Sequence, residues 1–249
     1  MEDKDQQAPI QVQDLHKSFG NQTVLNGIAL EVSHGETLAV MGRSGTGKSV
    51  LLKLLVGLQA PDSGSVRIRG QKIGEIEMNE LSEVRKRIGF LFQQAALYDS
   101  LTIEENVVFP MSRHSRTPQN EQKERARELL ANLGMEKDLD KLPSQISGGM
   151  QKRVGLARAL ALDPEILLFD EPTAGLDPIT AAEIGNLIVD LKKQRHMTAV
   201  VVTHDIRGAR AFADRVVLLH EGKILAEGRF VELRNSKDPV VSQFLQNAT

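Results

Sequence analysis

Eight residues from Gly42 to Ser49 have the types and spacing needed to hold phosphate groups. They read Gly42-Arg43-Ser44-Gly45-Thr46-Gly47-Lys48-Ser49 and match the pattern G-x-x-x-x-G-K-[ST]. The glycines let the backbone curve closely, so that its N–H groups point inward at phosphate oxygens. Lys48 would add a positive charge at the β- and γ-phosphates, and the Ser49 hydroxyl would bind Mg²⁺ at a helix N-terminus. The alternative interpretation is a flexible glycine loop without a ligand.

A pair of carboxylates supplies the second half of a phosphate-transfer site. Asp170 and Glu171 follow the apolar run from Ile166 to Phe169, which is typical of a buried strand. A carboxylate at the end of such a strand can hold Mg²⁺ largely through water, and the next one can polarise an attacking water molecule. We therefore expect Asp170 to be the metal residue and Glu171 the general base. Taken alone, the pair could equally be an acidic turn, but together with the glycine loop it indicates a P-loop NTPase.

A second anion site is predicted at the start of another helix. Ser147, Gly148 and Gly149 open an apolar helical segment that contains Val154 and Leu160. Successive backbone N–H groups and a serine hydroxyl at a helix N-terminus favour an anion. One molecule has little use for two phosphate sites on separate elements unless the two meet across a dimer.

The elements that must position these residues alternate between strands and helices. Apolar runs predict buried strands at 38–41, 166–169 and 199–202, and short strands are expected between residues 10 and 40. Helical spacing predicts a helix over 48–58, and Pro61-Asp62-Ser63-Gly64 predicts a turn. Residues 216–219 and 223–226 flank Glu221-Gly222 as in a hairpin. Pro178 behind Asp177 suits the first turn of a further helix.

The fold class follows from this order of elements. Strands that alternate with helices predict an α/β protein with a mostly parallel sheet and an antiparallel β portion. Residues 94 to about 161 are charged and carry no strong strand pattern. We expect them to form a helical subdomain inserted between strands.

The signature around Ser147 resembles that of the ATP-binding cassette (ABC) family, [LI]-S-G-G-x-x-[KR], and here reads Ile146-Ser147-Gly148-Gly149-Met150-Gln151-Lys152-Arg153. The resemblance extends from about Val12 to Gly228, with the motifs in the family's order. It implies the ABC ATPase fold of P-loop NTPases, ATP and Mg²⁺ as cofactors, and a head-to-tail homodimer. Each ATP would lie between the Gly42–Ser49 loop of one copy and Ser147, Gly148 and Gly149 of the other.

The same resemblance implies roles for four single residues. Phe19 would stack on adenine, and Gln93 would sense Mg²⁺ and the γ-phosphate. Asp177 would lie in the loop that crosses to the opposite subunit, and His204 would contact the γ-phosphate. Considered singly, a phenylalanine is more often a core residue, a histidine at a strand end is more often structural, and Gln93 carries no signal of its own.

Composition excludes several classes of function. The 249 residues include 31 basic and 33 acidic side chains, so a nucleic-acid partner is not expected. Cys is absent, which excludes disulfides and cysteine-ligated metal. The polar, acidic start MEDKDQQAPI does not resemble a secretory signal, and no apolar run approaches the ~18 residues of a membrane span. Any role at a membrane is therefore expected to come through a partner, and the ABC resemblance implies that this partner is a multipass permease.

Two stretches resemble the Mla/Mce-associated lipid-transport ATPases. One is Phe90-Leu91-Phe92-Gln93-Gln94-Ala95-Ala96-Leu97-Tyr98 with Asn106-Val107-Val108-Phe109-Pro110, and the other is Asp238-Pro239-Val240-Val241-Ser242-Gln243-Phe244-Leu245. This resemblance implies phospholipid transport in the bacterial envelope, at the cytoplasmic face of the inner membrane. An Mce-domain protein and a STAS-domain subunit are the implied additional partners. We expect an ABC nucleotide-binding domain over 10–228 and a C-terminal helical tail over 229–249.

Other functions remain as alternatives. Amino-acid importer ATPases share much of the first stretch, so a small-solute importer is the main alternative. A soluble ABC ATPase that acts on ribosomes or DNA would usually carry two cassettes or a long coiled coil, and neither pattern occurs here. A kinase or GTPase would have no reason to keep Ser147-Gly148-Gly149, and a scaffold that only binds ATP would not hydrolyse it.

Overall fold

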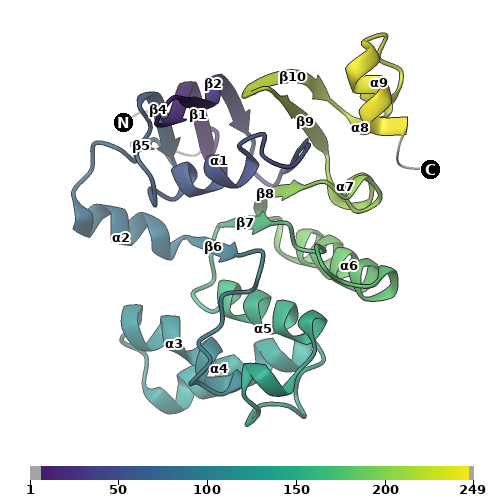
Figure 1. The fold of residues 1–249 in the computed structure, drawn as a ribbon. Coiled ribbons are helices and arrows are strands. Elements are labelled where there is room, and N and C mark those ends of the chain that lie inside the picture. Colours follow the sequence, from purple (N-terminus) through teal and green to yellow (C-terminus); the bar gives the residue numbers. More distant parts are fainter. Residues whose placement is uncertain (1–6, 247–249) are drawn as a thin grey trace.

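The computed structural model describes residues 7–246, with the side chains of residues 194, 195 and 246 left out. The first six residues of the polar N-terminal stretch and the last three of the predicted tail lie outside this range. A six-stranded sheet crosses the molecule (Figure 1). In order across it, its strands are β10 (Lys223–Gly228), β9 (Arg215–His220), β3 (Thr37–Gly42), β8 (Thr198–Thr203), β7 (Ile166–Asp170) and β6 (Ile88–Leu91). All neighbours are parallel except the β9–β10 hairpin.

The three predicted core strands are buried on both faces, and successive side chains serve different cores. Leu38 and Val40 of β3 belong to one hydrophobic cluster, whereas Ala39 and Met41 belong to another. The same alternation holds in β7 and β8. This is the expected behaviour of a parallel sheet covered by layers on both sides, and it confirms the α/β prediction.

The antiparallel portion forms a second sheet. Its strands, in order, are β2 (Gln22–Val32), β1 (Ile10–Phe19), β4 (Ser63–Ile68) and β5 (Gln71–Lys72). β1 and β2 span 10 and 11 residues and contain register shifts, so the expectation of short strands was wrong. The predicted turn at 61–64 is also partly wrong, because β4 begins at Ser63. A Cβ on Gly64 would lie 2.1 Å from the Asp14 carbonyl oxygen, so this glycine permits the close pairing of β4 with β1.

Helices cover the two faces of the central sheet differently. α1 (Lys48–Leu55) packs between the two sheets, and α2 (Met78–Lys86) precedes β6. Helix α1 ends three residues earlier than predicted, before Gly57 at φ +66°, so that Leu58 is 52% exposed rather than part of the apolar face. The opposite face is covered by α5 (Gly148–Leu160), α6 (Pro178–Arg195) and α7 (Ile206–Phe212).

The helical insert lies between β6 and β7 in the chain and below the central sheet in Figure 1. It comprises α3 (Ile103–His114), α4 (Gln119–Asn132), the short 3-10 helix η1 (Pro143–Gln145) and α5. After the hairpin of β9 and β10, the described chain continues into α8 (Phe230–Arg234) and α9 (Pro239–Gln246). Val241 and Leu245 of α9 join the same core as α5 and α6. In the described residues, no helix is long and apolar enough to cross a membrane.

Candidate nucleotide-binding and hydrolysis site

The loop from Gly42 to Lys48 connects the end of β3 to α1 and is held closed by its own contacts. Two glycines are required by close approach: a Cβ on Gly42 would lie 2.6 Å from the Leu219 carbonyl oxygen, and one on Gly47 would lie 2.7 Å from Leu25 Cδ2. Lys48 Nζ donates hydrogen bonds to the carbonyl oxygens of Gly42 (3.0 Å) and Arg43 (3.1 Å). The Lys48 ammonium group is therefore anchored at the mouth of the loop.

Lys48 is 7% exposed and faces the two carboxylates at the end of β7. Its Nζ lies 3.7 Å from Glu171 Oε1. Burial lowers the pKa of Lys48, and the attraction of Glu171 and Asp170 partly offsets this shift. The sequence separates these groups by more than 120 residues, but parallel strands place them at one edge of the sheet because β3 and β7 both pair with β8.

Asp170 and Ser49 form an oxygen-rich pair. Ser49 Oγ donates a hydrogen bond of 2.8 Å to Asp170 Oδ1. Burial raises the pKa of Asp170, the hydrogen bond from Ser49 opposes this, and the neighbouring Glu171 carboxylate raises it further. A carboxylate and a hydroxyl fit Mg²⁺, which usually takes one or two protein oxygens and completes its shell with water and phosphate. The described residues contain no cluster of three acidic or histidine side chains that would suit a metal bound by protein alone.

Glu171 is oriented by contacts on both carboxylate oxygens. Its Oε2 lies 2.8 Å from His204 Nδ1 and accepts the backbone N–H of His204 at 3.2 Å, while Oε1 faces Lys48. The backbone of Glu171 has φ +48°, which is uncommon for a residue with a side chain. Its N–H donates to the Val202 carbonyl oxygen at 2.9 Å. The Glu171 side chain is 10% exposed, and the side chain of His204 beside it is 63% exposed. The carboxylate therefore lies near the protein surface, next to an accessible histidine.

Gln93 follows β6 and has an exposed side chain. Its carbonyl oxygen accepts a hydrogen bond from Lys152 Nζ, which also donates to the Glu171 carbonyl oxygen at 3.2 Å. The Lys152 side chain therefore connects the backbone of Gln93 to the backbone of Glu171. Sequence reasoning missed Lys152. The available signal was its place in the basic position of the Ser147 signature.

Phe19, at the end of β1, is 46% exposed, which argues against the interpretation that it is a core residue. Lys17 Nζ lies 5.4 Å from the centre of its ring. An exposed aromatic ring is available for stacking.

Ser147, Gly148, Gly149 and Asp177 form a separate cluster where α5 and α6 begin, and these two helices cover the face of the sheet opposite α1 (Figure 1). Ser147 caps α5 by accepting the Met150 N–H, and Asp177 caps α6 through the N–H groups of Ile179 and Thr180 at 3.1 Å. A Cβ on Gly149 would lie 2.3 Å from Thr180 Cγ2, so the two helix starts touch. No described hydrogen bond or ion pair joins this cluster to the phosphate loop of the same chain.

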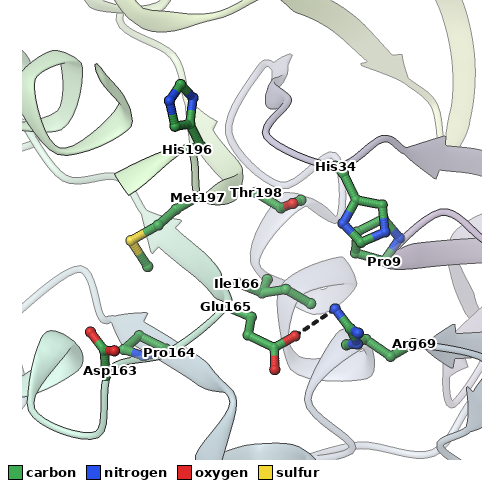
Figure 2. Close-up of a pocket in the computed structure, with 10 residues that line it drawn as sticks. All are labelled: Pro9, His34, Arg69, Asp163, Pro164, Glu165, Ile166, His196, Met197 and Thr198. Carbon is green, nitrogen blue, oxygen red and sulfur yellow. Dashed lines mark ion pairs between the residues drawn. The ribbon is translucent and has the colours of Figure 1, made fainter. Parts of the chain in front are cut away.

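A separate cavity of about 530 Å³ opens at the other end of the parallel strands, where β7 and β8 begin (Figure 2). Arg69 pairs there with Glu165 at 2.6 Å. His34 Nε2 lies 3.2 Å from the Gln7 carbonyl oxygen, and the Thr198 hydroxyl accepts the Gly35 N–H. The residues of the phosphate loop and the two carboxylates are at the opposite strand ends, so this cavity is not part of the candidate site.

Comparison with known proteins identifies the class. Residues 25–174 match the ABC transporter family, and the chain belongs to this family as an ATP-hydrolysing subunit. Among solved structures, a post-hydrolysis dimer of an ATP-binding cassette bound to ADP and phosphate aligns with a TM-score of 0.82 and 36% identity, over 88% of this chain and 98% of that one. A second, cbiO1 of Clostridium perfringens, part of an ABC transporter complex, aligns with a TM-score of 0.81 and 28% identity, over 97% and 100%.

Three curated relatives are similar to this chain over most of its length. "Protein TRIGALACTOSYLDIACYLGLYCEROL 3, chloroplastic" of Arabidopsis thaliana is 42% identical over 97% of this chain and 74% of its own length. "Probable ribonucleotide transport ATP-binding protein mkl" of Mycobacterium leprae is 42% identical over 95% and 68%. "Methionine import ATP-binding protein MetN" of Mesorhizobium japonicum is 41% identical over 88% and 60%. The sequence-based prediction of an ABC transporter ATPase is confirmed at this level.

The raised pKa of Asp170 leads to a stability prediction for Asp170→Asn. A carboxyl group whose pKa is raised by folding destabilises the folded protein when it is ionised, above that pKa, and has no such effect when it is protonated in both states. We expect Asp170→Asn to have a Tm at pH 7 equal to or above that of the wild type in the absence of nucleotide. The difference should disappear as the pH falls below about 4, the pKa of an unfolded aspartate. Thermal unfolding across pH measures it, and a Tm well below the wild type at pH 7 would contradict the burial argument.

Proposed function

We propose that two copies of this chain bind two ATP molecules head-to-tail and drive a membrane permease. The observation that carries the proposal is the separation of two phosphate-binding clusters within one chain. Lys48, Asp170 and Glu171 gather at the sheet edge, whereas Ser147 and Gly149 lie at the start of α5 on the other side of the sheet. ABC cassettes are known as dimers, as in the solved relative. A symmetric pair would bring the two clusters together twice.

The proposed roles follow from the geometry of each group. Lys48, the opposing Ser147 and His204 neutralise charge on the transferred phosphoryl group, and Glu171 orients the attacking water. Mg²⁺ would be held by Ser49, Asp170 and Gln93, and it would neutralise negative charge on the phosphate groups. Phe19 stacks on adenine, and Asp177 approaches the partner's site. The loop residues that enclose the phosphates are Gly42, Arg43, Ser44, Gly45, Thr46 and Gly47.

A groove between β6, α2 and the helical insert supports the permease interaction. It has a volume of about 580 Å³ and is lined in part by Phe90, Tyr98 and Phe109. Tyr98 is 45% exposed, and its ring centre lies 4.5 Å from that of Phe109. Arg158 donates to the carbonyl oxygens of Ala95 and Ala96 at 2.6 and 2.7 Å, which fixes the segment after Gln93. A partly apolar groove beside Gln93 suits a short helix of a permease at the cytoplasmic membrane face.

Asn106 is fully buried and holds the backbone of the segment from Tyr98 to Thr102. Its side chain accepts the Tyr98 N–H at 2.8 Å and donates to the carbonyl oxygens of Tyr98, Leu101 and Thr102. Asn106→Ala leaves these backbone groups without their partner, so we expect the free energy of unfolding to fall by about 1–3 kcal/mol. Chemical denaturation measures the change, with the exposed Asn132→Ala as control. Equal stabilities of the two variants would contradict the proposed clamp.

We propose phospholipid as the cargo and the bacterial inner membrane as the location. The first supporting feature is the resemblance of residues 90–98, 106–110 and 238–245 to the Mla/Mce-associated lipid-transport ATPases. The second is the Arabidopsis relative, whose name includes the name of a glycolipid. An Mce-domain protein and a STAS-domain subunit would complete such a system. The methionine importer relative favours the alternative of a small-solute importer. The division into a cassette over 10–228 and a tail over 229–249 is part of this proposal.

Affinity purification from native membranes in mild detergent tests the assignment. Mass spectrometry of the co-purified proteins and lipids should identify a multipass permease, an Mce-domain protein and bound phospholipid. Recovery of a permease with a solute-binding protein would replace the lipid assignment by the importer. If no permease of either kind is recovered, the result would contradict a role in transport.

A further inference from the structure

Lys152 is a buried lysine in the second turn of α5. It is 5% exposed and lies on the same helix as the apolar, buried Val154 and Leu156. Lysine is rarely buried to this extent unless its charge is compensated. Packing alone does not require a charge here, because an unbranched apolar side chain could follow the same path.

The compensation comes from the hydrolysis site. The ammonium group donates to the carbonyl oxygens of Gln93 and Glu171, the latter at 3.2 Å. Burial lowers the pKa of Lys152, while the attraction of the Asp170 and Glu171 carboxylates acts to raise it. The charge of Lys152 is thus compensated in part by the same two carboxylates that attract Lys48.

The group that Lys152 holds is the backbone of Glu171 at its unusual conformation. With φ at +48°, this residue needs surrounding contacts to keep its backbone in place. Its N–H is held by Val202, and its carbonyl oxygen accepts from both Lys152 Nζ and the Ala174 N–H at 3.2 Å. Lys152 is the contact that reaches Glu171 from the helical insert.

The helix that carries Lys152 is packed tightly against the chain after β6. A Cβ on Gly155 would lie 2.8 Å from Leu91 Cδ1 and 3.1 Å from Ala95 Cβ. A displacement of α5 therefore has to move the Gln93 segment, and Lys152 connects both to Glu171.

We propose that Lys152 is a positioning residue for ATP hydrolysis, which holds the backbones of Gln93 and Glu171 at fixed places relative to α5. The proposal rests on the proposed function, in which Glu171 orients the water. α5 begins with Ser147–Gly149, which that function places against the nucleotide of the partner copy. Lys152 follows in the next turn, so it links the first turn of α5 to the Glu171 of its own chain. Contact with one ATP molecule would thereby help to set the hydrolytic geometry at the other.

Steady-state ATP hydrolysis by the purified full-length chain tests the proposal with Lys152→Met, Lys152→Arg and Arg153→Met. A small misplacement of a reacting group lowers the chemical rate far more than substrate binding, so for Lys152→Met we expect kcat to fall about tenfold or more and KM for ATP to stay within about twofold. Lys152→Arg keeps a positive charge and donors, and should recover part of kcat. The Hill coefficient for ATP should fall towards one in Lys152→Met.

Arg153→Met is the matched control. Arg153 is the next residue of the same helix and donates to the Leu133 carbonyl oxygen and to Glu183, away from the hydrolysis site. Its kcat should stay close to that of the wild type, and thermal unfolding verifies that all variants are folded. A wild-type kcat in Lys152→Met, a parallel change in KM, or an Arg variant no better than the Met variant would overturn the proposal. A Glu171→Gln variant assayed alongside distinguishes failure of the Lys152 proposal from failure of the proposed function. If Glu171→Gln remains active, the role proposed for Glu171 itself is wrong.

Discussion

Replacing Glu171 by Gln should lower the rate of ATP hydrolysis by about a thousandfold, in the range of lost general-base catalysis. The amide keeps the size of the side chain and an oxygen that can accept the backbone N–H of His204. It cannot take a proton from water, and it loses the attraction to Lys48. Binding of ATP does not require that proton transfer, so the variant should accumulate as an ATP-bound dimer.

Two measurements on the Glu171→Gln variant follow from this. Phosphate release reports the rate, and size-exclusion chromatography with light scattering in the presence of ATP reports the dimer. A rate within about tenfold of the wild type would contradict the assignment of Glu171 as general base. An inactive variant that stays monomeric with ATP would instead point to a defect in nucleotide binding.

Lys48→Met should weaken the binding of MgATP by about a hundredfold, since the proposed contact of a buried charge with phosphate is lost. The methionine side chain fills nearly the same space, so the fold should persist. Burial lowers the pKa of Lys48 because it disfavours the charged form of the side chain. Removal of that charge should therefore reduce nucleotide affinity without a matching loss of stability.

The matched control is Lys53→Met, which removes a lysine from the last turn of the same helix, outside the phosphate loop. Isothermal titration with a non-hydrolysable ATP analogue measures affinity, and thermal unfolding measures stability. We expect the control to bind nearly as tightly as the wild type. Equal losses of affinity in the two variants would show that general electrostatics, rather than the position of Lys48, governs binding.

Much of the site was predictable because it depends on where parallel strands end. The loop after β3 and the carboxylates after β7 are short, local patterns, and a sheet edge brings them together whatever the intervening sequence. The start of α6 was also predictable, because Asp177 and Pro178 are a local capping signal that the structure confirms. Each of these patterns lies within a few residues of chain.

The parts that the sequence did not predict depend on contacts between distant segments. β6 has only four residues and is recognised by its pairing with β7 rather than by a pattern of its own. Gly64 was interpreted as part of a turn, although its lack of a Cβ permits close pairing with β1. The hydrogen bond between His204 and Glu171, and the double contact of Lys152, join segments 19 to 59 residues apart. The periodicity of residues within one segment does not predict contacts between distant segments.

The central claim is that one chain supplies the phosphate loop and another supplies Ser147–Gly149 at each ATP. A disulfide test is clean, because the chain has no cysteine. Thr46→Cys and Ile146→Cys would be combined in one Glu171→Gln chain, with each single cysteine variant as a control. A disulfide requires Cα atoms within about 7 Å, so it forms only where the two segments meet.

Oxidation of this double-cysteine chain with and without ATP, followed by non-reducing electrophoresis, is therefore the most direct test. We predict a cross-linked dimer whose yield rises with ATP and which neither single-cysteine variant reaches. A disulfide formed within one monomer, or no increase with ATP, would contradict an ATP site shared between two copies.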